Sequence, residues 1–204
     1  EAMRSAIAAE TVFALALNGS NEALMNVDNM SRKFKNKRVR AAAVEAMAAA
    51  ADTLGITSEE LADRIVPDLG FDRNLCRVFD YGKRQFNVYL KPSLEMEVFS
   101  GDKQIKTLPK PGTTDDKEIA DAAFNEFKEV KKQLKNVVAA QRSRLEYVLM
   151  CDRKWTSENW EKLFVGNAVM HCFAVGLIWG IYENGSLKDT FRYMDDGSFT
   201  TADG

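Results

Sequence analysis

The stretch of residues 115–152 constrains this chain more than any other, because its pattern predicts one helix of unusual length. Apolar residues recur there in steps of three and four, the spacing of one helical face, without interruption by Gly or Pro. The stripe comprises Ile119, Ala123, Phe127, Val130, Leu134, Val137, Leu145 and Val148, with Gln141 as a polar break. Such a helix would span about 55 Å. It therefore either breaks near Gln141 or serves as a spine for elements on both sides.

The start of this helix is marked by the residues before it. Pro109, Pro111 and Gly112 end the preceding segment, and Asp115 with Glu118 resembles a capping box. Acidic residues crowd the first turns and basic residues follow, as the helix dipole favours. A solvated helix with one core-facing stripe is the simplest interpretation. The alternative is a coiled-coil dimer seam, although Ala and Gln on the seam make its repeat loose.

The chain before residue 68 has a different pattern, which predicts a helical, repeat-like region over residues 1–67. Short helices are expected there, joined by short turns, and Thr57 with Glu60 forms a capping box for one of them. Short helices in this arrangement suggest antiparallel pairs stacked as in α-solenoids. No repeated period is found within this region. We therefore interpret it as a single repeat, the last one of an array that begins upstream.

Residues 68–204 predict an α+β domain, and the fold class of the whole chain is therefore α+β. Period-two alternation over 77–108 predicts a four-stranded antiparallel β-meander. In it, one core is expected to receive Phe86, Val88, Leu90, Met96 and Val98. Helices are expected over 157–177.

A second β region is expected over residues 178–201, after the predicted helices. Its main signal is Asn184-Gly185 between two apolar runs, a strong indication of a hairpin. We expect this region to lie close to the meander in space, with the long helix across both. The sequence leaves open whether the two β regions form one sheet.

Composition excludes several classes of protein. The 204 residues are 46% apolar and 28% charged with a net charge of −2, which predicts no global attraction to nucleic acid or membranes. Cys76, Cys151 and Cys172 are widely spaced, which favours reduced thiols in a cytoplasmic protein. The apolar run 168–182 is too short to span a membrane comfortably. Because the chain begins at Glu1 rather than Met, we interpret it as a fragment of a longer protein.

A search for chemistry predicts no catalytic residue, no cofactor and no metal site. Phosphate-binding and dinucleotide-binding glycine motifs are absent from the sequence. The single histidine, His171, adjoins Cys172 in a predicted helix, where neighbouring side chains point about 100° apart and form no nucleophile–base pair. A packed histidine is therefore expected. The spacing of His and Cys does not match a zinc site.

The one local charge anomaly is a run of basic residues between the second and third predicted helices. It consists of Arg32, Lys33, Lys35, Lys37, Arg38 and Arg40, with no acidic residue among them. Positive charge at a helix N-terminus opposes the dipole, so helix stability does not explain the run. Such runs can bind phosphate backbones. The alternative is a solvated turn that keeps the protein soluble.

Several stretches together resemble a known family. They are ADRIVPDLGF (62–71), LPKPG (108–112), KKQL (131–134), RKW (153–155), Trp160 with Leu163-Phe164, LIWG (177–180), TFR (190–192) and DGS (196–198). In this order, over residues 15–204, they are similar to the bacterial domain-of-unknown-function family 4132, often described as molybdate metabolism regulator-like. The chain departs from that family at Asn167-Ala168, where many relatives have His-Pro.

The resemblance implies a large, cytoplasmic bacterial protein in which helical repeats and sometimes a WGR domain accompany this region. It defines no catalytic residues. Three hypotheses follow: a non-enzymatic interaction, scaffolding or regulatory region that binds protein partners or other domains of its own chain; a nucleic-acid-associated module that uses residues 32–40; and an enzyme of unrecognised type. No membrane partner is expected.

Overall fold

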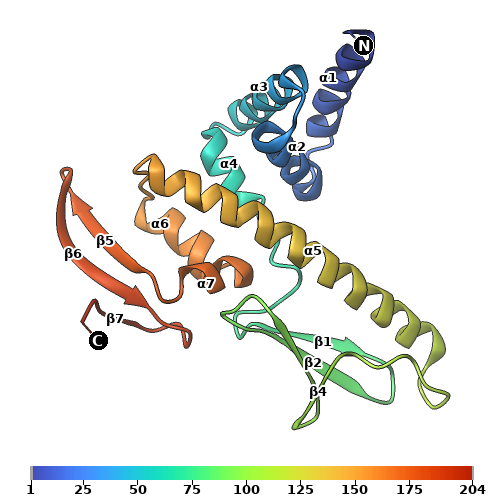
Figure 1. The fold of residues 1–204 in the computed structure, drawn as a ribbon. Helices are drawn as coiled ribbons and strands as arrows, with labels where there is room; N and C mark the ends of the chain where they lie inside the picture. The colour runs from blue at the N-terminus through green and yellow to red at the C-terminus, as the bar shows by residue number, and fades with distance from the viewer. Residues whose placement is uncertain (1, 204) are drawn as a thin grey trace. The chain divides into compact units, whose positions relative to one another are not determined.

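The protein was analysed as a computed structural model, which describes residues 2–203, with side chains from residue 6 onward. The chain separates into two compact units, Glu1–Pro67 and Asp68–Gly204. The first unit contains α1 (Ala2–Leu17), α2 (Asn21–Lys33), α3 (Lys37–Thr53) and α4 (Ser58–Arg64) (Figure 1).

The second unit mixes helices with two β-sheets. Its first part contains β1 (Cys76–Asp80), β2 (Gln85–Leu90), β3 (Met96–Ser100), β4 (Lys103–Ile105) and α5 (Lys117–Met150). Its second part contains α6 (Ser157–Trp160), the π-helical turn η1 (Glu161–Val165), α7 (Ala168–Ala174), β5 (Ile178–Glu183), β6 (Ser186–Tyr193) and β7 (Phe199–Thr201). The predicted α+β fold class, with its long helix, is confirmed.

The helices of the first unit pack on α3, which contacts both α1 and α2. The starts of α3 and α4 carry side-chain caps, of which the one on α4 was predicted. The capping box of Thr57 and Glu60 is present, and the side chain of Asn36 accepts hydrogen bonds from two backbone N–H groups at the start of α3. Fully buried small residues such as Ala43 let the helices approach closely around Val27 and Met47.

The long helix α5 is continuous over 34 residues and does not break at Gln141. Gln141 is buried, and its Oε1 accepts a hydrogen bond of 2.8 Å from the buried Arg144 guanidinium. A polar side chain that is paired in this way can lie on the buried stripe without interrupting the helix.

Two details of the predicted helix are wrong. Ile119 is 46% exposed, and its neighbour Ala120 is buried instead. The cap is Asp116, whose Oδ1 accepts from the backbone N–H of Ile119 at 3.2 Å, because the carboxylate of Asp115 is bound elsewhere. The exposure of Ile119 follows from the helical period: it lies about 80° around the helix from Phe127, whereas Ala120 lies only about 20° from it.

The first sheet has the predicted meander order β1-β2-β3-β4, with antiparallel neighbours throughout. Val88 lies opposite Val98 and Leu90 opposite Met96. Phe86, Val88, Leu90 and Val98 are buried, as their alternation indicated. This sheet packs on α5, where the rings of Phe79 and Phe127 meet edge to face at 5.5 Å.

The two β regions do not share one sheet, a point that the sequence left open. The strands β5-β6-β7 form a second, separate sheet, and every strand in both sheets pairs with its chain neighbour. In this second sheet, the predicted hairpin turn is present, with positive φ at Asn184 and Gly185. Of the four edge strands, β4 and β7 have three residues each, whereas β1 and β5 have five and six.

The predicted helix ending at Leu177 is three residues too long. Val175 is extended and Gly176 has a φ of +80°, so the chain leaves α7 after Ala174 and turns into β5. Before α7, the turn η1 is wider than an α-helix. A Cβ at Gly166 would lie 2.6 Å from the carbonyl oxygen of Lys162, so only glycine fits where this turn ends.

The exposure of Ile119 and the burial of Phe127 lead to a prediction about stability. Truncation of Phe127 to Ala should lower the free energy of unfolding by about 3–5 kcal/mol, because it empties the contact between α5 and β1. Truncation of the exposed Ile119 to Ala should change it by less than about 1 kcal/mol. Urea denaturation followed by circular dichroism measures both. Equal losses in the free energy of unfolding for the two variants would contradict the assignment of Phe127 to the buried face of α5 and Ile119 to the exposed one.

Candidate interaction surfaces

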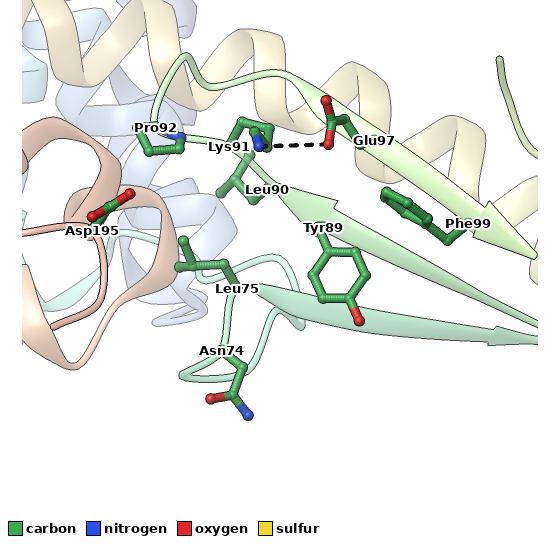
Figure 2. Close-up of a pocket in the computed structure, with 9 residues that line it drawn as sticks. All are labelled: Asn74, Leu75, Tyr89, Leu90, Lys91, Pro92, Glu97, Phe99 and Asp195. Atoms are coloured by element: carbon green, nitrogen blue, oxygen red, sulfur yellow. Dashed lines mark ion pairs between the residues drawn. The ribbon is translucent and has the colours of Figure 1, made fainter. Parts of the chain in front are cut away.

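A shallow pocket lies where the start of β1, the β2–β3 connection and the β6–β7 turn meet (Figure 2). It encloses about 310 Å³. Its lining residues are Asn74, Leu75, Tyr89, Leu90, Lys91, Pro92, Glu97, Phe99 and Asp195. The two sheets therefore approach each other here, through a turn rather than by strand pairing.

The charged groups of this pocket are solvated. Lys91 and Glu97 form an ion pair at 3.6 Å, with side chains that are 49% and 35% exposed. Tyr89 and Phe99 pack edge to face at 5.5 Å, and a hydrogen bond to Cys76 raises the pKa of the Tyr89 phenol. An ion pair that is exposed to water contributes little stabilisation, and its two side chains are only weakly held in place. This pocket therefore offers polar contacts to a ligand rather than a desolvated reactive group.

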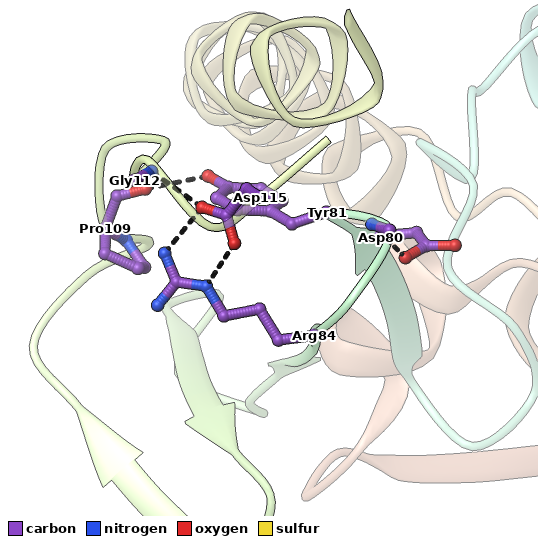
Figure 3. A network of polar contacts seen from close by, with 7 residues as sticks. Asp80, Tyr81, Arg84, Pro109, Gly112 and Asp115 are labelled. Atoms are coloured by element: carbon purple, nitrogen blue, oxygen red, sulfur yellow. Dashed lines mark hydrogen bonds and ion pairs between the residues drawn. The ribbon is translucent and has the colours of Figure 1, made fainter. Parts of the chain in front are cut away.

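A polar network ties the β1–β2 hairpin to the loop before α5 (Figure 3). Both Arg84 Nε and Nη2 donate to the Asp115 carboxylate at 2.8 Å. Asp115 also accepts from the backbone N–H of Gly112, and its side chain is only 1% exposed. The hydrogen bond from Arg84, reinforced by Gly112, lowers the pKa of Asp115. Here a bidentate pair orients two chain segments.

Tyr81 completes this network at the centre of the hairpin. Its side chain is buried, and its hydroxyl donates a hydrogen bond of 2.7 Å to the Pro109 carbonyl. Its own carbonyl accepts from the Asp116 N–H at 3.1 Å. A Cβ at Gly82 would lie 2.8 Å from the Cβ of Asp116, so the close approach requires glycine. The polar groups of this network bind one another and hold the β1–β2 hairpin against the loop before α5, so the network has a structural role.

An aromatic cluster joins the second sheet to α6 and η1. Trp160 lies at its centre, with ring centroids 5.2 Å from Trp179, 5.5 Å from Phe191 and 5.7 Å from Tyr193. Trp155 and Phe164 extend the cluster beyond Trp179. Since Trp179 pairs with Phe191 across β5 and β6, their side chains lie on one face of the sheet. Trp179 and Phe191 are half-buried on that face, while Ile181, further along the same face, is 46% exposed.

His171 lies beside this cluster as a buried histidine, only 5% exposed. Its Nδ1 shares a hydrogen bond of 2.8 Å with the Tyr193 hydroxyl, and its Nε2 is buried without a hydrogen-bond partner among the described residues. Burial lowers its pKa, and the backbone and charge of Asp195 offset part of that shift. The neighbouring Cys172 thiol donates to the Ala168 carbonyl, and burial raises its pKa to about 12. A thiol in that environment is a poor nucleophile.

The predicted basic run lies at the turn between α2 and α3, and its members differ. Arg32 forms a two-point ion pair with Asp28, with contacts of 2.8 and 3.2 Å. Arg32 is therefore neutralised within α2. The side chains of Lys35, Lys37, Arg38 and Arg40 are exposed, and Phe34 between them is 41% exposed. The sequence alone did not separate Arg32 from the rest, although its spacing of four from Asp28 was a usable signal.

The outer face of the β5–β6 hairpin is a surface that sequence reasoning missed. Ile178, Tyr182 and Leu187 are 59%, 45% and 54% exposed. A Cβ at Gly180 would lie 2.9 Å from both the Tyr182 ring and Leu187, so these side chains meet over that glycine. This strip lies opposite the face that carries Trp179 and Phe191. Both faces of the hairpin are apolar, so alternation could not tell which one packs.

Other features of the described residues bear on function. All three cysteines are free thiols. Within residues 2–203, no group of three or more His, Cys, Asp or Glu side chains is placed to hold a metal ion. In the same part of the chain, none of the helices is both long and apolar enough to cross a membrane.

Comparison with known proteins places the chain in a family. The profile of the family "Domain of unknown function (DUF4132)" matches residues 102–204, and the chain belongs to this family. It is 32% identical over 203 residues, or 98% of its length, to the "Uncharacterized protein YehI" of Escherichia coli (strain K12). The chain spans only 17% of the length of that relative. No solved structure matches it.

The Tyr81 hydroxyl should contribute measurably to stability. Changing Tyr81 to Phe should lower the free energy of unfolding by about 1–2 kcal/mol, because the part-buried Pro109 carbonyl loses its donor. The matched control is Tyr182→Phe, at a tyrosine that is 45% exposed, where the change should stay within about 0.5 kcal/mol. Chemical denaturation of both variants tests this, and an unaffected Tyr81 variant would contradict the role of the network.

His171 should make stability depend on pH between 7.5 and 5.5. Because its pKa is lower in the folded chain than in the unfolded chain, its contribution is present above about pH 6.5 and is lost as pH falls. The loss should be less than about 1.4 kcal/mol per pH unit. As His171 is the only histidine, His171→Gln should flatten this part of the profile. The midpoints of urea denaturation at three pH values measure this dependence for both proteins. Parallel profiles of stability against pH for the unmodified chain and His171→Gln would contradict the prediction.

Proposed function

We propose that these 204 residues form a non-enzymatic interaction region of a larger bacterial protein, and that the outer face of the β5–β6 hairpin is its docking surface. The observation that carries the proposal is the exposed apolar strip of Ile178, Tyr182 and Leu187. Exposed single apolar residues are common, but a contiguous strip along a hairpin is typical of a binding surface.

The strip is suited to docking because its support is rigid. The opposite face of the same strands is anchored by Trp179 and Phe191 in the aromatic cluster around Trp160. A rigid surface loses little conformational entropy when it binds, so more of the apolar burial appears as affinity. Polar residues flank the strip, among them Glu183, Lys188 and Arg192. An apolar centre with a polar rim is the usual composition of an interface.

The occupant that we propose is another segment of the same polypeptide. The Escherichia coli relative is about six times as long as this chain, so most of its residues lie outside the matched region. A segment tethered to the docking surface binds at an effective concentration near the millimolar range, which favours a contact within the chain over one with a separate protein. The experiment below distinguishes this occupant from a separate protein partner and from a second copy of the chain.

Hydrogen exchange of the β5–β6 amides tests this proposal. The exchange rates of residues 178–193 are measured in the isolated 204-residue chain and in the whole protein. Docking in cis should slow exchange in the whole protein by about 10-fold or more, because opening then requires release of the docked segment. Leu187→Asp should restore fast exchange there, while the isolated variant keeps its stability within about 1 kcal/mol.

The control is Val78→Asp, a change at a valine of the other sheet that is 52% exposed, against 54% for Leu187. It should leave the protection of β5 and β6 unchanged. Equal exchange in the isolated chain and the whole protein would overturn docking in cis. Protection that depends on protein concentration would replace it with a second copy as the occupant.

The finer implications of the family resemblance stay predictions. A regulatory role in molybdate metabolism, an accompanying WGR domain and a cytoplasmic location are properties of the whole protein that the resemblance suggests. The second candidate function, a nucleic-acid-associated module, is favoured by the exposed cations Lys35, Lys37, Arg38 and Arg40 at the turn between α2 and α3.

A further inference from the structure

We propose that the turn between α2 and α3 binds single-stranded nucleic acid, with its cations on the phosphates and the ring of Phe34 stacked on a base. The site comprises Phe34, Lys35, Lys37, Arg38 and Arg40, here named the basic turn. It lies in the first unit, whereas the docking surface proposed above lies in the second, and the inference does not depend on that surface. It deepens the second candidate function by naming the ligand as a single strand.

The cations of the basic turn have no carboxylate partners. Among the described residues, none of Lys35, Lys37, Arg38 and Arg40 forms an ion pair, whereas Arg32 is held by Asp28. No acidic residue occurs in the sequence between Asp28 and Glu45. Their charge is therefore available to an anion outside the chain.

The distribution of charge within the first unit is uneven. Six of the eight lysines and arginines of residues 1–67 lie between residues 32 and 40, although the unit as a whole has nine acidic residues. Attraction of a polyanion depends on local potential rather than on net charge. The slightly acidic chain as a whole therefore does not exclude binding at this turn.

The position of the basic turn at the start of α3 strengthens this potential. Lys37 and Arg38 occupy the first turn of a 17-residue helix, where the dipole is positive and basic residues are unfavourable. Asn36 already accepts hydrogen bonds from the N–H groups of Arg38 and Val39. The backbone amides are thus occupied, and the phosphate contacts fall to the long side chains.

Phe34 distinguishes a single strand from other polyanions. It follows α2 in an extended conformation, is 41% exposed, and makes no ring contact among the described residues. Exposed aromatic rings beside cations are the stacking platforms of proteins that bind single strands. In a duplex the bases are stacked on each other and unavailable to such a ring, so we favour unpaired DNA or RNA.

The test is fluorescence anisotropy of the whole 204-residue chain with a labelled oligo-dT and a labelled oligo-U of about 12 nucleotides. Four phosphate contacts predict a slope of about −3 in log K against log salt, or about a 50-fold loss of affinity from 50 to 200 mM salt. The variant with Lys35, Lys37, Arg38 and Arg40 all changed to Gln should lose binding at every salt concentration.

Phe34→Ala separates stacking from simple attraction of charge. It should weaken single-strand binding by about 10-fold and leave the salt slope unchanged, because stacking involves no phosphate. A hairpin duplex of the same length should bind more weakly than the single strand and should not respond to Phe34→Ala. Circular dichroism of each variant establishes that α1–α4 are intact.

The matched control changes Lys131, Lys132, Lys135 and Arg142 of α5 to Gln. It alters the net charge by the same four units at exposed positions of another element. Single-strand affinity should stay within about 3-fold of the unmodified chain. Absence of binding at 50 mM salt, an equal loss in this control, or equal binding of duplex with no effect of Phe34→Ala would each overturn the proposal.

Discussion

The network of Arg84, Asp115 and Tyr81 sets how the second unit packs, because it fixes where α5 begins. The Tyr81 carbonyl accepts a hydrogen bond from the Asp116 N–H, which holds the start of α5 at the end of β1, and further along the helix Phe127 packs on Phe79 of that strand. Binding of Asp115 by Arg84 leaves Asp116 as the cap. The meander therefore orients the helix through a pair of charges at one end, and apolar packing then follows along its length.

The two proposed binding surfaces differ in chemistry and in the elements that support them. The strip on β5 and β6 is apolar and is supported from behind by the ring of Trp160 and its neighbours. The basic turn is made of long, solvated side chains around the start of α3. Neither surface is explained by the stability of its own unit. Apolar groups in water and unpaired cations at a helix N-terminus are both unfavourable for an isolated fold.

Local signals predicted much of this structure. Two local motifs were recognisable because the residues that form each of them lie within four positions in the chain. They are the capping box of Thr57 with Glu60 and the hairpin turn at Asn184-Gly185. The burial of Val88 and Val98 on one face of the meander followed from strand alternation. For the candidate sites, the basic run was evident in the sequence. The outer strip was not, because β5 and β6 are apolar on both faces and only the position of the aromatic cluster distinguishes them.

The sequence by itself determined most of the elements and the order of the meander strands, because helix periodicity, strand alternation and turn chemistry act over a few neighbouring residues. Only the tertiary structure decided which carboxylate caps α5, that two sheets form rather than one, and which face of β5 and β6 stays open. Each of these depends on groups far apart in the chain: Arg84 with Asp115, Trp160 with Phe191, and His171 with Tyr193. Such pairs leave no trace in local spacing, because the fold alone brings them together.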